Sequence, residues 1–124
     1  MINRGYSNIS QELFNEITKK LNGKYLNIYY ATNSNHTDFN EYMVSDQINN
    51  KYYFLDFYIK DNNKVIEFDG DYWHGEKRGN QFRDKQREDE LKYLGYVNIL
   101  RVKERDYKNN PEKVIEDCLK FINE

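Results

Sequence analysis

The sequence predicts an α/β fold, a three-layer-like sandwich in which helices flank a mixed central β-sheet. Amphipathic helical patterns stand near both ends of the chain, and strand-like segments and a charged helix lie between them. The order helix, strands, helix, strand, helix is typical of such a sandwich. With 124 residues the chain has the length of a single domain, assigned to residues 1–124, and can bury about two-thirds of its unfolded surface.

The N-terminal part predicts a helix followed by a strand. Ser7–Asn22 opens with capping residues and closes at Gly23, a residue suited to a helix C-cap. The apolar residues of this helix recur on one arc: Ile9, Leu13, Phe14, Ile17 and Leu21. Tyr25–Thr32 has strand composition, whereas Glu41–Asn50 is compatible with either a short strand or a helical turn.

A hairpin of two strands is expected in the middle of the chain. Tyr52–Lys60 and Lys64–Asp69 both alternate with a period of two, which is the pattern of strands in a sheet. Between them stands Asp61-Asn62-Asn63, whose residue types favour a turn. The function prediction depends on this hairpin and on the residues that follow it.

Three acidic residues interrupt the strand pattern of the hairpin. Asp56 stands inside the first strand, where Asp is normally depleted, and Glu67 and Asp69 share one face of the second. An even-length loop places Asp56 opposite either Glu67 or Asp69, and both registers put the three carboxylates on one face. Like charges at that spacing repel unless a cation lies between them, and Mg²⁺ prefers carboxylate and water ligands. The pattern therefore indicates a metal site, although a solvated acidic face would show the same pattern.

The C-terminal half predicts a charged helix, a strand and an amphipathic helix. In Glu76–Glu90 five basic residues balance five acidic ones, which is typical of a solvent-facing helix with ion pairs, and Gly95 ends it. Val97–Val102 is an apolar strand expected beside the hairpin in the centre of the sheet. Asn110-Pro111 begins the last helix. Its buried stripe is expected to contain Val114, Ile115, Cys118, Leu119 and Ile122.

Composition narrows the class of protein. A net charge of −2 argues against a protein that wraps nucleic acid through bulk positive potential, but an acidic metal site is compatible with it. The single cysteine, Cys118, excludes a disulfide framework and a multi-cysteine zinc site. One cysteine, no apolar run of membrane-spanning length and no signal peptide together indicate a cytoplasmic protein.

The chain resembles the PD-(D/E)XK nuclease superfamily, and within it the very-short-patch-repair-like endonucleases and their phage homing-endonuclease relatives. The likeness runs from about Ser7 to Val102 and rests on an ordered set: SQELF (10–14), Asp56, IEFDGDYWHG (66–75), Arg83-Asp84 and LGY (94–96). It implies a restriction-endonuclease-like fold, double-stranded DNA as substrate, Mg²⁺ or Mn²⁺ as cofactor, and phosphodiester hydrolysis. For a phage-encoded enzyme the compartment is the host cytoplasm.

The resemblance implies candidate catalytic residues. Asp56 resembles the strand aspartate that binds the metal, Glu67 the glutamate of the E-x-K motif, and Asp69 stands where its lysine would be; all three are candidate metal ligands. His74 resembles a histidine used near the metal-bound water, and its ordinary pKa suits a general base or acid at neutral pH. Asp84 resembles the helix aspartate that completes the constellation.

Three positions match the family less closely. With Asp69 in place of the lysine, another group has to handle protons or charge near the scissile phosphate. The repair enzymes bind a structural zinc through cysteines and histidines, and with Cys118 alone no structural zinc is expected. In the first helix the corresponding catalytic acid is Glu12, with Glu16 as the alternative nearer the apolar arc.

Candidate DNA contacts lie at the end of the hairpin and on the charged helix. Tyr72 and Trp73 resemble the aromatic pair that repair-type members wedge between base pairs. The basic residues that could contact flanking phosphates are Lys77, Arg78, Arg83, Lys85 and Arg87. Arg87 can also pair with Asp84, three residues earlier on the helix.

These features predict a metal-dependent DNA endonuclease of nicking or homing type. A small domain with one site would nick one strand, and cutting both strands would need a homodimer. The alternative is a catalytically inactive DNA-binding module of the same fold. The three acidic residues argue against it, because without a metal they would only repel the DNA phosphates. A third is an interaction domain that uses its 12 tyrosines and depends on no divalent ion.

Overall fold

The computed structural model describes residues 8–31, 41–70 and 78–124. The helices of this part are α1 (Asn8–Leu21), α3 (Arg78–Tyr93), α4 (Glu104–Asn109) and α5 (Pro111–Asn123). Its strands are β1 (Ile28–Tyr30), β2 (Tyr42–Asp46), β3 (Lys51–Leu55), β4 (Phe57–Ile59), β5 (Lys64–Asp69) and β6 (Asn98–Lys103). None of the described helices is long and apolar enough to cross a membrane.

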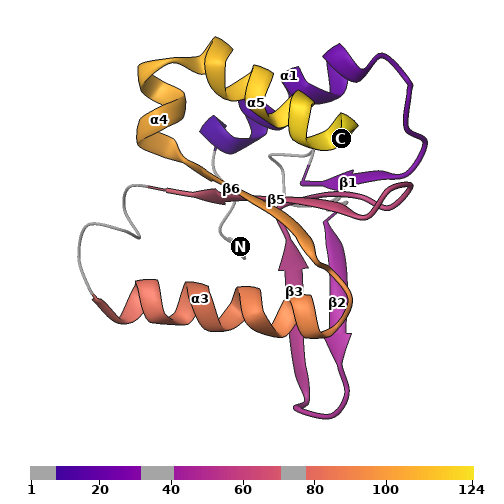
Figure 1. The fold of residues 1–124 in the computed structure, drawn as a ribbon, viewed down its shortest axis with the longest axis vertical. Coiled ribbons are helices and arrows are strands. Elements are labelled where there is room, and N and C mark those ends of the chain that lie inside the picture. Colours follow the sequence, from indigo (N-terminus) through magenta and orange to yellow (C-terminus); the bar gives the residue numbers. More distant parts are fainter. Residues whose placement is uncertain (1–7, 32–40, 71–77) are drawn as a thin grey trace.

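The central sheet has the strand order β1-β4-β5-β6. The pairs β1–β4 and β4–β5 are antiparallel, whereas β5–β6 is parallel, so the sheet is mixed. Helices α1, α4 and α5 cover one face, and α3 lies on the other face beside the separate two-stranded sheet of β2 and β3 (Figure 1). The predicted α/β sandwich with a mixed sheet between helices is confirmed.

The main core lies between the sheet and the helices α1 and α5. The predicted apolar arcs of both helices face this core, and Leu13, Ile17 and Ile122 are fully buried in it. At the start of α5 the Asn110 side chain accepts a hydrogen bond from the Lys113 backbone N–H, which is the predicted cap. Cys118 is fully buried, and burial raises the pKa of its thiol to about 12, so it is a core residue.

The central hairpin differs from the prediction at Asp56. The first strand is not continuous, because β3 ends at Leu55, β4 begins at Phe57, and Asp56 forms a bend between them. Among the described strands, β3 pairs only with β2, and it leaves the main sheet. Strand β4 pairs with β5 with Phe57 opposite Ile66, and this register brings Asp56 level with Glu67, one of the two predicted pairings.

Other elements sharpen or correct the prediction. The ambiguous segment Glu41–Asn50 contains a strand, β2. Strand β6 lies beside the hairpin as expected, but at the edge of the sheet and not in its centre. Helix α4 was not predicted, because its six residues ERDYKN bury only Tyr107 and are too short to show a helical period.

Candidate active site

Asp56 lies at the bend between β3 and β4, next to Glu67 on β5. The backbone N–H of Asp56 donates a hydrogen bond to Glu67 Oε2 at 3.0 Å. Asp56 Oδ2 in turn accepts one from the backbone N–H of Phe68 at 2.8 Å. Within the described part of the chain Asp56 Oδ1 makes no hydrogen bond. One oxygen of this carboxylate is therefore free to bind a ligand.

The surroundings of Asp56 disfavour a negative charge on it. Burial and, after it, the carboxylate of Glu67 raise the pKa of Asp56 well above its ordinary value of 3.8, and Glu41 adds to the effect. The Phe68 N–H and the charge of Arg87 act in the opposite direction and do not compensate. A cation bound beside Asp56 would offset the effects of burial and of Glu67 on this pKa, because it favours the charged carboxylate.

Asp56 also lines a small cavity below α1. Its volume of about 20 Å³ is enough for one water molecule. The cavity is lined by Ser10, Gln11, Phe14, Ala31, Glu41, Asp56 and Phe68. Two carboxylates, those of Asp56 and Glu41, thus share this space although they are far apart in sequence.

Glu67 is held by an arginine from the opposite side. Its side chain is only 5% exposed, and Glu67 Oε1 accepts a hydrogen bond from Arg87 Nε of α3 at 2.9 Å. Arg87 Nη2 also donates to the backbone oxygen of Phe54 at 2.7 Å, and its guanidinium lies 5.4 Å from the ring centre of Tyr53. Both oxygens of Glu67 are therefore engaged within the protein.

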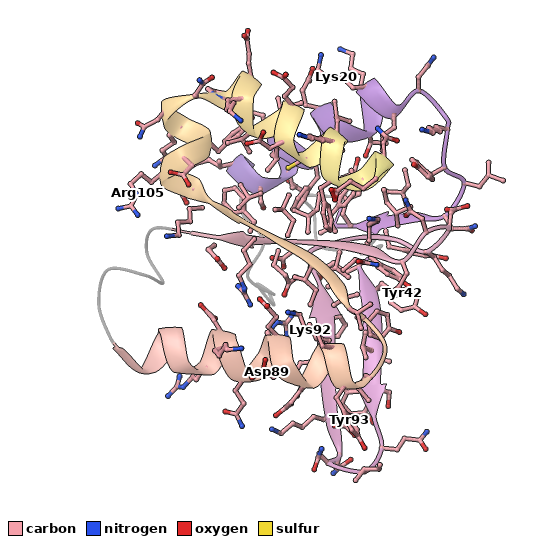
Figure 2. All side chains as sticks on the ribbon, in the orientation of Figure 1. Lys20, Tyr42, Asp89, Lys92, Tyr93 and Arg105 are labelled. Carbon is pink, nitrogen blue, oxygen red and sulfur yellow. The ribbon has the colours of Figure 1, made fainter. Side chains whose placement is uncertain are left out.

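A second arginine, Arg101 of β6, binds the other acids of this face. Arg101 Nη1 donates to Asp69 Oδ1 at 2.7 Å and Arg101 Nε to Glu88 Oε1 at 2.9 Å, while Arg101 Nη2 reaches the backbone oxygen of Asp84 at 3.2 Å. The outer oxygen of Glu88 pairs with Lys92 at 3.0 Å; Figure 2 labels Lys92 on α3. Through Arg101, the carboxylates of Asp69 on β5 and Glu88 on α3 therefore help to hold α3 against the sheet.

The prediction that three carboxylates share one face is wrong. Asp56 lines the cavity below α1, whereas Glu67 and Asp69 contact arginines on the side of α3. The cause is the bend, which takes Asp56 out of the strand alternation. Among the described residues no three His, Cys, Asp or Glu side chains come together as a metal site.

The comparison with family models decides the class of protein. The model of REase_MTES_1575, a restriction-endonuclease-like family, matches residues 35–122. The chain belongs to this family. The match contains the hairpin, the bend at Asp56 and the elements α3, β6 and α4. No curated protein and no solved structure matches the chain significantly.

In this REase_MTES_1575 chain the two acids of α1 lie away from the cavity lining. Glu12 is exposed, and its Oε1 accepts a hydrogen bond from the Tyr107 hydroxyl of α4 at 2.7 Å. Glu16 is half-buried. The residues that α1 contributes to the cavity beside Asp56 are instead Ser10, Gln11 and Phe14. A catalytic role for Glu12 stays a prediction.

Several predicted residues of the REase_MTES_1575 site fall where no contact can be described. Tyr72, Trp73, His74 and Lys77 lie outside the described residues, and of Arg78 only the place at the start of α3 is described. Arg83 is exposed on α3, as a phosphate contact would be. The predicted pairing of Arg87 with Asp84 is not formed, because the Arg87 guanidinium binds Glu67 and the backbone oxygen of Phe54 instead.

Two residues of this site were missed by the sequence reasoning. Glu41 stands before β2 in an ambiguous segment, and nothing in the pattern there marks it. Arg101 is a charged residue inside the apolar strand VNILRV, opposite Glu67 in the parallel register. This is the same kind of anomaly that drew attention to Asp56, so Arg101 could have been found.

Proposed function

We propose that this member of the REase_MTES_1575 family is a metal-dependent DNA endonuclease that hydrolyses phosphodiester bonds. The observation that carries the proposal is the environment of Asp56. This carboxyl has a free oxygen, is partly buried, and lies beside the carboxylate of Glu67, an arrangement that a cation would stabilise. Nuclease family membership supports DNA as the substrate.

The donor atoms around Asp56 fit Mg²⁺ or Mn²⁺. Mg²⁺ usually binds through one or two carboxylates and keeps several water molecules. Asp56 offers its free Oδ1, and Glu41 lines the same small cavity. A bound divalent ion would supply charge stabilisation at the scissile phosphate and a water of lowered pKa.

The other residues of the proposed site handle protons and hold the duplex. His74 exchanges a proton with the attacking water or the leaving oxygen, and Asp84 orients His74 or a nearby water. Tyr72 and Trp73 wedge between base pairs and bend the DNA. The proposed contacts with flanking phosphates are Lys77, Arg78 and Arg83. These roles follow the likeness to very-short-patch-repair-like and homing endonucleases.

The proposed enzyme nicks DNA as a monomer. One Asp56 per chain provides one cutting site, so cleavage of both strands requires two copies of the chain. A homodimer with two sites is the simplest arrangement for double-strand cleavage.

Plasmid nicking tests the proposal. Supercoiled plasmid is incubated with the protein and Mg²⁺ or Mn²⁺, with and without a chelator. We expect the wild type to produce open circles only with a divalent ion, Asp56→Asn to produce none, and His74→Ala to be strongly impaired. Lys113→Gln, which removes an exposed ion pair with Asp117 on α5, is the matched control and should cut like the wild type. Equal cutting by Asp56→Asn would contradict the proposal.

A second candidate function is a catalytically inactive DNA-binding module. The observation that favours it is that arginines bind Glu67 and Asp69, which leaves fewer carboxylate oxygens for a metal. It predicts binding to duplex DNA that does not depend on divalent ions, and intact plasmid under all conditions. Electrophoretic mobility shifts beside the nicking assay separate the two functions.

A further inference from the structure

We infer that Glu67 and Arg87 act together as positioning residues for Asp56, and not as a metal ligand and a phosphate contact. The inference rests on the proposed function, in which Asp56 is the central residue. It changes the role expected for two residues and leaves that of Asp56 unchanged.

A closed set of hydrogen bonds surrounds the bend. Arg87 Nη2 donates to the backbone oxygen of Phe54, and Arg87 Nε donates to Glu67 Oε1. Glu67 Oε2 accepts from the backbone N–H of Asp56, only two residues after Phe54. Arg87 and Glu67 therefore bridge the backbone on both sides of Leu55. We call this set of three hydrogen bonds the clamp.

The clamp replaces the strand pairing that is lost at the bend. Asp56 belongs to neither β3 nor β4, so its N–H needs an acceptor other than a strand partner. Glu67 provides that acceptor, and the contact fixes the backbone from which the Asp56 carboxylate reaches the Phe68 N–H and the cavity. The position of Asp56 is thus set by a side chain of β5 and a side chain of α3.

Burial makes the clamp specific. The Glu67 side chain is 5% exposed and that of Arg87 28% exposed, so water competes little for their hydrogen bonds. Both Glu67 oxygens already have donors, and binding a metal would mean sharing or breaking these bonds. Arg87 is directed inward to Phe54, Glu67 and Tyr53, whereas Arg83, one turn earlier on α3, is exposed.

Two measurements that need no DNA test the clamp. Hydrogen exchange at the Asp56 amide, followed by NMR, is compared in wild type, Glu67→Gln, Arg87→Gln and the milder Arg87→Lys. We expect exchange to be about tenfold faster or more in Arg87→Gln and Glu67→Gln, since each change removes from the clamp a hydrogen bond between charged groups, and such a bond is worth at least that factor. Arg87→Lys keeps the charge but cannot donate from two nitrogens at once, so its exchange rate should fall between those of the two glutamine variants and that of the wild type.

The direction of the change in Mn²⁺ affinity separates positioning from ligation. Removal of a positive charge near a bound cation strengthens cation binding by electrostatics alone. If Arg87 positions Asp56, Arg87→Gln should instead weaken Mn²⁺ binding by about 10-fold to 100-fold, as Glu67→Gln should, and the double variant should be no worse than either. Asp56→Asn should abolish binding. Tighter binding in Arg87→Gln, or a loss in Glu67→Gln equal to that in Asp56→Asn, would overturn the inference.

The salt dependence of DNA binding tests the role of Arg87 from another side. A phosphate contact that is removed lowers the slope of log affinity against log salt by about one unit. We expect this for Arg83→Gln and an unchanged slope for Arg87→Gln, whose kcat falls while its KM for DNA stays near that of the wild type. A lower slope in Arg87→Gln with unchanged Mn²⁺ affinity would make Arg87 a phosphate contact.

The two proposals can fail separately. Unchanged amide exchange at Asp56 in Glu67→Gln and Arg87→Gln overturns the clamp even in a protein that cuts DNA. Full plasmid nicking by Asp56→Asn contradicts the proposed function, and amide exchange then still shows whether the clamp exists.

Discussion

The two faces of the central sheet have different contents. The face toward α1 and α5 is mostly apolar, with Phe57, Ile66 and the buried apolar residues of both helices in one cluster, although Lys64 lies over the Phe121 ring of α5 on the same side. On the face toward α3, a second apolar cluster surrounds Val65 and Leu91. Further along, β5 presents its two acids to the two arginines of that side. Because side chains alternate along a strand, β5 supplies both faces at once.

The two faces contribute differently: the apolar face mainly stabilises the fold, whereas the ion pairs of the α3 face mainly orient side chains. Burial of apolar surface stabilises the fold wherever the shapes fit, and it fixes no single polar geometry. Buried ion pairs add little net stability, because desolvation offsets most of their attraction, but their directional hydrogen bonds define orientation. The polar groups of the α3 face can therefore hold the backbone that carries a reactive carboxylate such as Asp56.

The largest effect is expected for a change at Asp56, and it is an effect on activity. In the proposed enzyme, Asp56→Asn should lower nicking about a thousand-fold, because charge stabilisation by a metal is worth several kcal/mol. The measurement is the single-turnover rate at saturating Mg²⁺ together with far-UV circular dichroism, which should not change. If Asp56→Asn were unfolded, or if its nicking rate were unchanged, the expectation that Asp56 serves activity and not folding would be wrong.

The same variant should alter the pH dependence of stability. The pKa of Asp56 is raised in the folded state, so its contribution to stability is complete below the ordinary value of 3.8 and is lost as the pH rises through the folded pKa. Asparagine does not titrate. We expect Asp56→Asn to gain in free energy of unfolding relative to the wild type as the pH rises above 3.8, in denaturant titrations. A gap that does not widen with pH would contradict the raised pKa.

On the apolar face the expected effect is on stability alone. Ile17→Ala removes a fully buried side chain of α1 and should lower the free energy of unfolding by about 3 kcal/mol. Nicking per folded molecule should stay close to that of the wild type, since Ile17 does not line the cavity beside Asp56 and takes no part in the hydrogen bonds of the clamp. Urea unfolding and the nicking rate, measured below the onset of unfolding, check both parts.

Local patterns predicted most of the fold. The arcs of α1 and α5 and the Asn110-Pro111 start follow from helical periodicity and capping, which act within a few residues. The edge position of β6 did not follow, because an apolar strand covered by helices on both faces has the composition of a central one. Pairing partners are decided by tertiary structure.

The candidate site was predicted only in part, for the same reason. The strand aspartate was conspicuous in the sequence, and the loop length left two pairings open, with Glu67 or with Asp69, of which the structure has the first. Arg87, 31 positions after Asp56, contacts Phe54 and Glu67 beside the bend, although its local neighbour Asp84 looked like its partner. No window of the sequence contains both ends of that interaction, so the common face expected for the three acids was wrong.

Arg101 offers a sharper test of the α3 face. Arg101→Gln removes the ion pair that Arg101 makes with Asp69, whose side chain is only 11% exposed. We expect a loss of about 2 kcal/mol in the free energy of unfolding, because a partly buried charge loses its donor. Adding Asp69→Asn should recover part of the loss, since the carboxylate that loses this ion pair is then absent. A purely additive double variant would show that the two side chains do not interact.

The smallest effect is expected on the outer side of the same carboxylate. Glu88 binds Arg101 with Oε1 and Lys92 with Oε2, but the Lys92 side chain is 44% exposed and that of Arg101 24% exposed. Lys92→Gln should lower the free energy of unfolding by only about 0.3 kcal/mol, because water screens an exposed pair on one helix. High salt should remove this difference and leave most of the Arg101→Gln effect, since buried pairs are screened less. If Lys92→Gln and Arg101→Gln lost equal free energies of unfolding with equal sensitivity to salt, the ion pairs of the α3 face would be as solvated as those of an ordinary protein surface. Solvated ion pairs of that kind could not hold Asp56 in one position.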